Sequence, residues 1–225
     1  MKVNIVGRNK GKFEKQVRKY FKKGNDVIIA YGGDGTFLYS ELKYPGIPKL
    51  LVRHSSSCKN CEHDYSEILE LLKKKRYKIV KSSKVEARIG NKKLVGLNEV
   101  NIHYKVPCAI RLNVKFGREE VNMIGDGVLI STPYGSTGYF GSVVRKKFEK
   151  GLGLAFNNPV KKIKNRILND KSVVNVKVLR GPGTLTVDCS KEIIKLKTGD
   201  IIRIKKSGKY AKLIQLKGKK LKCEV

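Results

Sequence analysis

The sequence feature that most constrains the fold is an apolar run at residues 27–30 (VIIA) that ends in the glycine-rich segment YGGDGT at residues 31–36. A short apolar run rich in β-branched residues and closed by two glycines is typical of a buried strand that leads into a tight loop. Residues 36–42 can then begin a helix. Because turn amides and the N–H groups of a helix start form a concave anion site, this segment predicts a phosphate-binding loop.

A carboxylate, Asp34, lies within this loop. An acid beside bound phosphates is electrostatically unfavourable unless it holds a metal or takes a proton from an attacking hydroxyl. Asp34 is therefore a candidate general base for phosphoryl transfer. The alternative is an ordinary aspartate in a glycine-rich turn, because a lone GGDGT is a short motif that also occurs by chance.

A second stretch, GDGVLISTPYGSTGY at residues 125–139, repeats this design. An apolar run is followed by a loop dense in glycine and hydroxyl residues, and then by a possible helix start. Between the two stretches, LNEV at residues 97–100 places an amide and an acid at the entrance to another strand-like run. Three separate segments thus carry polar groups next to apolar runs.

The pattern of elements changes near residue 78. Before it, strands at 3–6, 27–30 and 48–52 alternate with helices at 11–24, 36–42 and 66–72, which predicts a parallel sheet. After it come an alternating run at 80–89, a returning strand at 94–104, a hairpin at 108–124, and short strands at 173–178, 184–187, 193–196 and 201–204. The sequence predicts a Rossmann-like α/β domain at residues 1–78 and an all-β, β-sandwich-like domain at residues 79–210.

Taken in order, GGDGT, Asn-Glu and GDGxxxSTPxGSTxY resemble the motif set of the ATP-NAD kinase family, and the last motif is the most specific. The resemblance covers roughly residues 1–205 in the order of elements and points to a short, archaeal-like member. It implies the NAD kinase type of fold, in which an α/β domain is followed by an all-β dinucleotide-binding domain. In that fold the last residues, here about 211–225, return to the first domain.

The resemblance also implies a reaction. A phosphoryl group passes from ATP, or from another donor such as polyphosphate, to the 2′-hydroxyl of the adenosine ribose of NAD, with Mg²⁺ accompanying ATP. Asp34 matches the family's catalytic acid, which contacts the ribose hydroxyls and acts as general base. The loop around the phosphates is shaped by Gly33, Gly35 and Thr36.

Other matches concern the dinucleotide. Asn98 offers a donor and an acceptor that suit an adenine edge, and Glu99, an acceptor when ionised, suits ribose hydroxyls. Asp126 matches an acid that reaches a dinucleotide bound mainly by a neighbouring subunit, which implies a homodimer or homotetramer. The further dinucleotide-contacting positions are Tyr134, Thr137, Gly138, Tyr139 and Ser142. Taken alone, each of these residues has a structural alternative: Asn98-Glu99 as a solvated strand end, Asp126 as a plain turn residue and Tyr139 as a core residue. The spacing between the motifs favours the binding roles.

The chain also departs from the family pattern. Tyr134 stands where the family usually has a small residue, so its ring crowds the adenine or stacks on it, and Gly138 stands where alanine is usual. The family's Gly-x-x-Gly-Phe-Leu segment after the third strand is replaced by RHSSSCKNCEH at residues 53–63, and Asp188-Cys189 stands near the family's late Asp-Gly pair. These changes leave the phosphoryl acceptor open.

Two rival functions follow. The first is another GGDGT-type kinase, such as a lipid kinase, although lipid kinases lack the STPxGSTxY stretch. The second is a non-catalytic homologue that binds a dinucleotide or nucleic acid, which the altered loop and the high charge suggest.

The replaced loop has a metal hypothesis of its own. His54, Cys58, Cys61 and His63 have the side chains of zinc ligands. Because zinc sites usually use separated pairs of ligands, a Cys58–Cys61 disulfide or an inert loop is favoured over zinc. His103, alone on a predicted strand, is interpreted as structural.

The composition limits the partners and the location. In 225 residues, 50 Lys and Arg against 19 Asp and Glu give a net charge of +31, which attracts any polyanion. The lysines are spread along the chain without a recognised nucleic-acid motif, so we expect non-specific attraction at low salt. Five cysteines, the absence of a signal peptide, and the absence of a membrane-spanning apolar run predict a cytoplasmic protein with free thiols.

Overall fold

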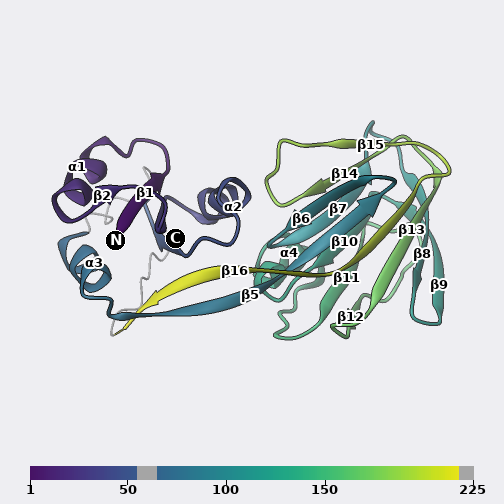
Figure 1. The fold of residues 1–225 in the computed structure, drawn as a ribbon. Helices are drawn as coiled ribbons and strands as arrows, with labels where there is room; N and C mark the ends of the chain where they lie inside the picture. The colour runs from purple at the N-terminus through teal and green to yellow at the C-terminus, as the bar shows by residue number, and fades with distance from the viewer. Residues whose placement is uncertain (55–64, 218–225) are drawn as a thin grey trace. The chain divides into compact units, whose positions relative to one another are not determined.

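The computed structural model describes residues 1–54 and 65–217, which divide into two compact units (Figure 1). The first unit contains Met1–Ser82 and the described residues from Tyr210 onward, and the second contains Ser83–Lys209. The chain leaves the first unit within β5 (Tyr77–Ile89) and returns to it within β16 (Ile201–Leu216). No helix in the described part of the chain has the length and apolarity needed to cross a membrane.

The first unit is built on parallel strands in the order β2–β1–β3–β4. These are β1 (Lys2–Val6), β2 (Lys22–Lys23), β3 (Val27–Tyr31) and β4 (Lys49–Val52). The connecting helices are α1 (Gly11–Tyr20) and α2 (Asp34–Lys43), and α3 (Tyr65–Lys73) precedes β5. Near its end, β16 adds to this sheet, since Leu213 pairs with Lys49 and both Ile214 and Leu216 pack in the core of the unit.

The predicted helix at 11–24 is too long. It ends at Tyr20, because Phe21 takes an extended conformation that buries its ring in the core, with 5 % of its surface exposed. Lys22 and Lys23 then pair with β1. The apolar face predicted for this helix continues past the helical residues, so periodicity alone did not locate the helix end.

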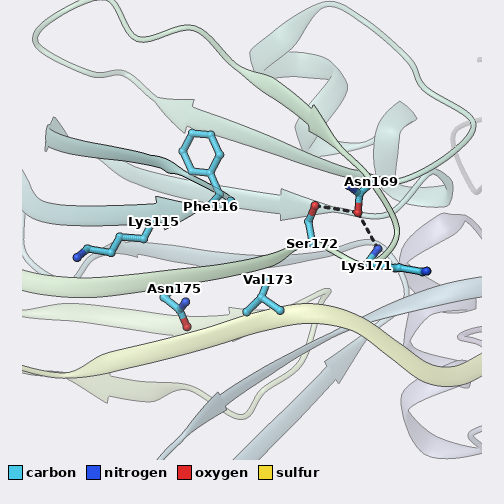
Figure 2. A pocket seen from close by; sticks show the side chains of 8 residues that line it. Lys115, Phe116, Asn169, Lys171, Ser172, Val173 and Asn175 are labelled. Atoms are coloured by element: carbon cyan, nitrogen blue, oxygen red, sulfur yellow. Dashed lines mark hydrogen bonds between the residues drawn. The ribbon is translucent and has the colours of Figure 1, made fainter.

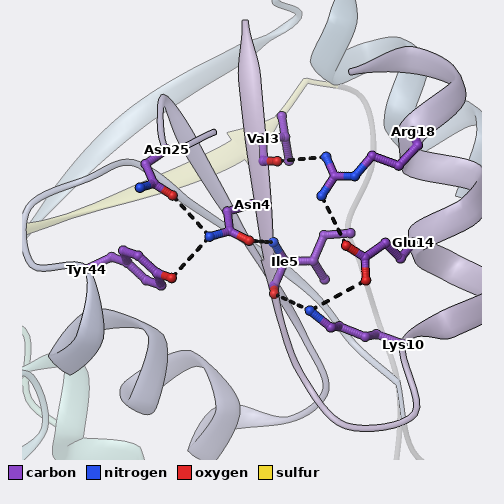
Figure 3. A network of polar contacts seen from close by, with 8 residues as sticks. All are labelled: Val3, Asn4, Ile5, Lys10, Glu14, Arg18, Asn25 and Tyr44. Carbon is purple, nitrogen blue, oxygen red and sulfur yellow. Dashed lines mark hydrogen bonds and ion pairs between the residues drawn. The ribbon is translucent and has the colours of Figure 1, made fainter. Parts of the chain in front are cut away.

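Side chains of α1 and of Lys10, the residue directly before it, tie the helix to β1 (Figure 3). The Lys10 ammonium donates to the Ile5 carbonyl at 3.0 Å, and the Arg18 guanidinium donates to the Val3 carbonyl at 2.9 Å. Both cations also pair with Glu14, at 3.6 and 3.2 Å. The bonds reach β1 carbonyls from the helix that packs on the sheet, and they hold the first βαβ connection in place.

The second unit consists of antiparallel strands in two sheets that share one apolar core. One sheet contains β8 (Ile110–Phe116), β9 (Glu119–Gly125), β13 (Val173–Arg180) and the first part of β16. In the same sheet, β5 pairs with β16 and with β6 (Lys92–Gly96). The other sheet has the order β12–β11–β10–β7–β14–β15. Its strands are β7 (Glu99–Tyr104), β10 (Gly127–Ser131), β11 (Leu152–Asn157), β12 (Arg166–Leu168), β14 (Gly183–Val187) and β15 (Ile194–Leu196). The predicted fold class, an α/β part followed by a two-sheet β part, is confirmed.

One predicted strand is wrong in a way that matters for function. The run at 94–104 is not continuous: it breaks into β6, which pairs with β5, and β7, which pairs with β10 and β14 in the other sheet. Leu97 and Asn98 form the link between the two strands. A single strand cannot belong to both sheets of a sandwich without a bend, and here the bend falls at Leu97 and Asn98, directly before Glu99. Sequence reasoning also missed β11, an apolar run beside β10.

Candidate active site

The glycine-rich loop lies between β3 and α2, as the sequence predicts. Gly33 is the N-cap of α2, and Asp34 is the first helical residue, with a side chain that is 65 % exposed. Gly35 and the half-buried Thr36 follow in the first turn. The N–H groups of the first turn of a helix are typical anion-binding groups. An exposed carboxylate therefore stands beside a group of amides suited to phosphate.

Arg53 is a residue of this region that the sequence did not single out. It follows β4 directly, and its guanidinium lies 2.9 Å from an oxygen of the Asp34 carboxylate. Since β3 and β4 are parallel neighbours, their carboxyl ends meet at one edge of the sheet, which explains why residues 19 positions apart are in contact. The pair joins a cation to the candidate general base.

His54 belongs to an aromatic cluster at the same edge. Its ring stacks on Tyr31 at a centroid distance of 4.4 Å, and Tyr31 stacks on Phe13 at the same distance. The Tyr65 hydroxyl lies 3.4 Å from Nδ1 of His54. The other proposed zinc or disulfide residues, Cys58, Cys61 and His63, lie outside the described residues, so both hypotheses about this loop stay predictions.

In the second unit, the Asn98-Glu99 pair lies against the STPYGSTGY segment, which contains a 3₁₀ turn (Tyr134–Thr137) and α4 (Tyr139–Val144). The Thr132 N–H donates to the Asn98 carbonyl at 2.8 Å, and the Thr132 hydroxyl donates to the Leu97 carbonyl at 2.6 Å. A Cβ at Gly135 would lie only 2.3 Å from the Asn98 carbonyl oxygen, so this close approach requires glycine. The second and third motifs therefore form one site.

Two acceptors of this site are buried without a hydrogen-bond partner within the described chain: Oδ1 of Asn98 and Oε2 of Glu99. Glu99 is only 8 % exposed. Burial, and secondly the nearby Asp188 carboxylate, raise the pKa of Glu99 to about 7. Leaving a buried acceptor unpaired costs about 1–3 kcal/mol, so the two atoms are suited to hydrogen-bond donors of a ligand.

Tyr139 and Asp126 lie close enough to interact electrostatically. Burial raises the pKa of Tyr139, a hydrogen bond from Asn157 opposes this, and the charges of Asp126 and Glu99 raise it further. The Asn157 amide donates to the Tyr139 hydroxyl at 2.8 Å. The ring of Tyr139, 37 % exposed, is therefore not a core side chain.

The other residues predicted to contact the dinucleotide differ in their exposure and in whether their polar groups are already hydrogen-bonded. Tyr134 and Gly138 are half-buried, and Thr137 is exposed. The Ser142 hydroxyl donates to the Tyr139 carbonyl within α4 at 2.7 Å, so it is already engaged with its own helix. A substrate contact from Ser142 would have to use the remaining lone pairs of that hydroxyl.

Sequence reasoning gave Asp188 no role. Its carboxylate accepts hydrogen bonds from the N–H groups of Leu97, Asn98 and Glu99. Its only sequence signal is the position near the family's late Asp-Gly pair.

A hollow of about 530 Å³ lies elsewhere on the second unit, between the end of β8 and the start of β13 (Figure 2). Within it, the Asn169 side chain accepts hydrogen bonds from the Lys171 N–H and the Ser172 hydroxyl. None of the predicted site residues lines it. This hollow is therefore separate from the site described above.

The chain was compared with known proteins. Residues 97–216 match the family model of the ATP-NAD kinase C-terminal domain. An NAD kinase of Saccharolobus solfataricus is 32 % identical over 197 residues, which cover 84 % of this chain and 79 % of the relative. An NAD kinase of Saccharolobus islandicus is 32 % identical over 161 residues, 70 % of this chain and 65 % of the relative. The chain thus spans slightly less than two thirds of the length of the latter.

Solved structures show the same fold. The Archaeoglobus fulgidus NAD kinase in complex with ATP aligns with a TM-score of 0.77 at 20 % identity, covering 96 % of this chain and 94 % of the other. The yeast NADH kinase complexed with NADH aligns with a TM-score of 0.75 at 19 % identity, covering 89 % and 63 %.

Proposed function

This chain belongs to the ATP-NAD kinase family, and from that premise we propose that it phosphorylates the 2′-hydroxyl of the adenosine ribose of NAD to give NADP, with ATP or another phosphate donor. The relatives that support this are named NAD kinases, and one solved neighbour holds ATP. The observation that carries the proposal is the pair of buried acceptors that have no hydrogen-bond partner among residues 1–54 and 65–217, Oδ1 of Asn98 and Oε2 of Glu99. An adenine amino group and ribose hydroxyls supply the donors that these atoms lack.

The dinucleotide is held by the second unit. Asn98 pairs with the adenine edge, Glu99 accepts from ribose hydroxyls, and the exposed ring of Tyr139 offers a face for the base. The same segment contributes further predicted dinucleotide contacts, from Tyr134, Thr137, Gly138 and Ser142. Binding energy from these contacts orients the acceptor hydroxyl, which is the main task of the protein in phosphoryl transfer.

Asp34 acts as the general base. Its carboxylate takes the proton of the 2′-hydroxyl as the oxygen attacks the terminal phosphorus of the donor, and the bond from that phosphorus to the leaving phosphate breaks. The amides at the start of α2, including the loop formed by Gly33, Gly35 and Thr36, bind phosphate oxygens. Mg²⁺ bound to the ATP phosphates supplies charge neutralisation when it is present.

The assembly and the location are part of the same proposal. Asp126 is a carboxylate near Tyr139 that serves a dinucleotide bound by a neighbouring copy, so we place the active form as a homodimer or homotetramer. Within the described chain, the exposed thiols of Cys108 and Cys189 form no disulfide, which fits a reducing, cytoplasmic location.

The decisive experiment measures NADP formation from NAD and Mg-ATP by the wild type and by Asp34→Asn. Loss of the general base is expected to lower kcat by at least about a hundredfold. Asp26→Asn is the matched control: Asp26 is an exposed carboxylate of the same unit that accepts a hydrogen bond from the Lys2 N–H, and it should leave kcat unchanged.

Two results would contradict the proposal. A folded wild type that binds NAD but forms no NADP indicates another phosphoryl acceptor or a non-catalytic binder. A wild type without NAD affinity removes the assignment of Asn98 and Glu99 altogether. Replacing ATP by polyphosphate in the same assay identifies the donor.

A further inference from the structure

Asp188 is held in an unusual position directly after β14. Its Oδ1 accepts from the Asn98 N–H at 2.7 Å and the Glu99 N–H at 3.1 Å, while Oδ2 accepts from the Leu97 N–H at 2.7 Å. In return, the Asp188 N–H donates to the Glu99 carbonyl at 3.1 Å. The backbone of Asp188 has φ +47°, in the left-handed region that Asn and Asp enter more readily than most residues. One carboxylate thus binds consecutive amides of the link between β6 and β7.

Gly96 makes room for this carboxylate. A Cβ at Gly96 would lie 2.8 Å from Oδ1 of Asp188 and 2.9 Å from the Glu99 carbonyl oxygen. Any side chain there must push the carboxylate or the turn out of place. Burial raises the pKa of Asp188, and this is opposed first by the hydrogen bonds from the three backbone amides and then by the charge of the buried Lys84, which is 4 % exposed.

These bonds decide the path of the Leu97–Asn98–Glu99 turn. Hydrogen bonds to an ionised acceptor are stronger than neutral ones, and here they satisfy amides that leave one sheet before the next sheet begins. The Asn98 and Glu99 side chains extend from this turn and carry the buried acceptors for which the described residues supply no hydrogen-bond donor. A turn fixed before the ligand arrives saves the ordering entropy that binding would otherwise cost.

We propose, on the basis of the proposed function, that Asp188 is a positioning residue of the NAD site, whose carboxylate presets the Asn98-Glu99 turn for the adenosine half of the dinucleotide. It acts through the backbone of the residues that touch the ligand. Sequence separation hides this role, because Asn98 and Asp188 are 90 positions apart.

The Asp188 charge has a second effect, on Glu99. Burial first, and Asp188 second, raise the pKa of Glu99 to about 7. Within the described chain, the other ionisable groups that act on Glu99, Tyr139 or Asp188, or are acted on by them, include Asp126, Tyr104, Cys189 and Lys84. Because the ionised carboxylate accepts from two ribose hydroxyls, NAD affinity of the wild type should rise as pH increases through about 7.

The test combines amide exchange and NAD binding on the full chain. In Asp188→Asn, the amides of Leu97, Asn98 and Glu99 should exchange with solvent at least about tenfold faster, while those of β7 beyond them stay protected. The dissociation constant for NAD should rise about tenfold or more, since bonds to a charged acceptor are lost. The midpoint of its pH dependence should move to lower pH, because a negative charge near Glu99 is removed.

Gly96→Ala separates position from charge. The added methyl separates the carboxylate from the turn, by moving one or the other, and leaves the charge of Asp188 in place, so the same amides should exchange faster and NAD should bind more weakly, with the pH midpoint still near 7. This variant also decides the question if Asp188→Asn does not fold. Cys189→Ser is the matched neighbour control, and its affinity for NAD should stay within about twofold of the wild type.

The outcomes distinguish the positioning role of Asp188 from the proposed function on which it rests. If the wild type binds NAD and both variants keep wild-type amide exchange and affinity, the positioning role of Asp188 is overturned. Weaker binding in Asp188→Asn with an unmoved pH midpoint removes the electrostatic effect on Glu99. If the wild type binds no NAD, the proposed function fails, whereas amide exchange of the unliganded protein still tests whether Asp188 fixes the turn.

Discussion

At the residue scale, the contact between Asp34 and Arg53 determines whether a loss of activity in Asp34→Asn can be assigned to catalysis and not to a loss of stability. The two side chains are 65 % and 37 % exposed, and exposed ion pairs contribute little to stability. Asp34→Asn and Arg53→Ala should therefore each change the free energy of unfolding by less than about 1 kcal/mol. Urea denaturation monitored by circular dichroism measures this. A loss of several kcal/mol would show that Asp34 is a structural residue, and reduced activity of the mutant would then report misfolding.

At the element scale, α2 is fastened to β4 by a buried charge pair. The Lys49 ammonium lies 2.5 Å from the Glu41 carboxylate, with side-chain exposures of 0 % and 2 %, and it also donates to the carbonyls of Tyr44 and Ile47. Glu41→Ala removes the carboxylate beside a buried ammonium and should cost about 3–5 kcal/mol of unfolding free energy. Because α2 begins at Asp34, this pair also supports the glycine-rich loop that precedes the helix.

The double variant Glu41→Met with Lys49→Met is the matched control for this pair. Apolar residues of similar length in place of both charges should restore most of the lost stability, because neither charge is then left buried alone. Guanidinium denaturation of the single and double variants gives the coupling. A single Glu41→Ala variant as stable as the wild type would show that the pair does not hold the helix.

At the scale of the whole molecule, the net charge of +31 favours non-specific binding of polyanions, which has to be distinguished from specific binding of NAD. Binding to a random DNA duplex releases many counterions and should fall about a thousandfold between roughly 50 and 200 mM salt. NAD carries only a pyrophosphate, so its affinity should fall far less over the same range. Fluorescence titrations with labelled duplex and with NAD at each salt concentration measure both. Duplex binding that survives high salt and depends on base sequence would instead support the nucleic-acid rival.

The sequence by itself determined the parts that rest on local pattern. Apolar runs and glycine-rich turns located β3, the glycine-rich loop after it and most of the β strands, because buried strands and tight turns need those residue types at short range. The resemblance of the three motifs to those of the ATP-NAD kinase family selected Asp34, Asn98 and Glu99 as predicted site residues. Where a local pattern is continuous across a break, as in the run at 94–104, sequence reasoning merged two strands into one.

Only the tertiary structure decided which distant residues support that site. Arg53 reaches Asp34 because two parallel strands end at one edge of a sheet, and Asp188 reaches the Asn98-Glu99 turn because β14 pairs with β7. It also decided that Oδ1 of Asn98 and Oε2 of Glu99 are buried with no hydrogen-bond partner in the part of the chain that the structure describes. Strand pairing and burial depend on contacts between residues far apart in the chain, and no short-range pattern of residue types encodes them.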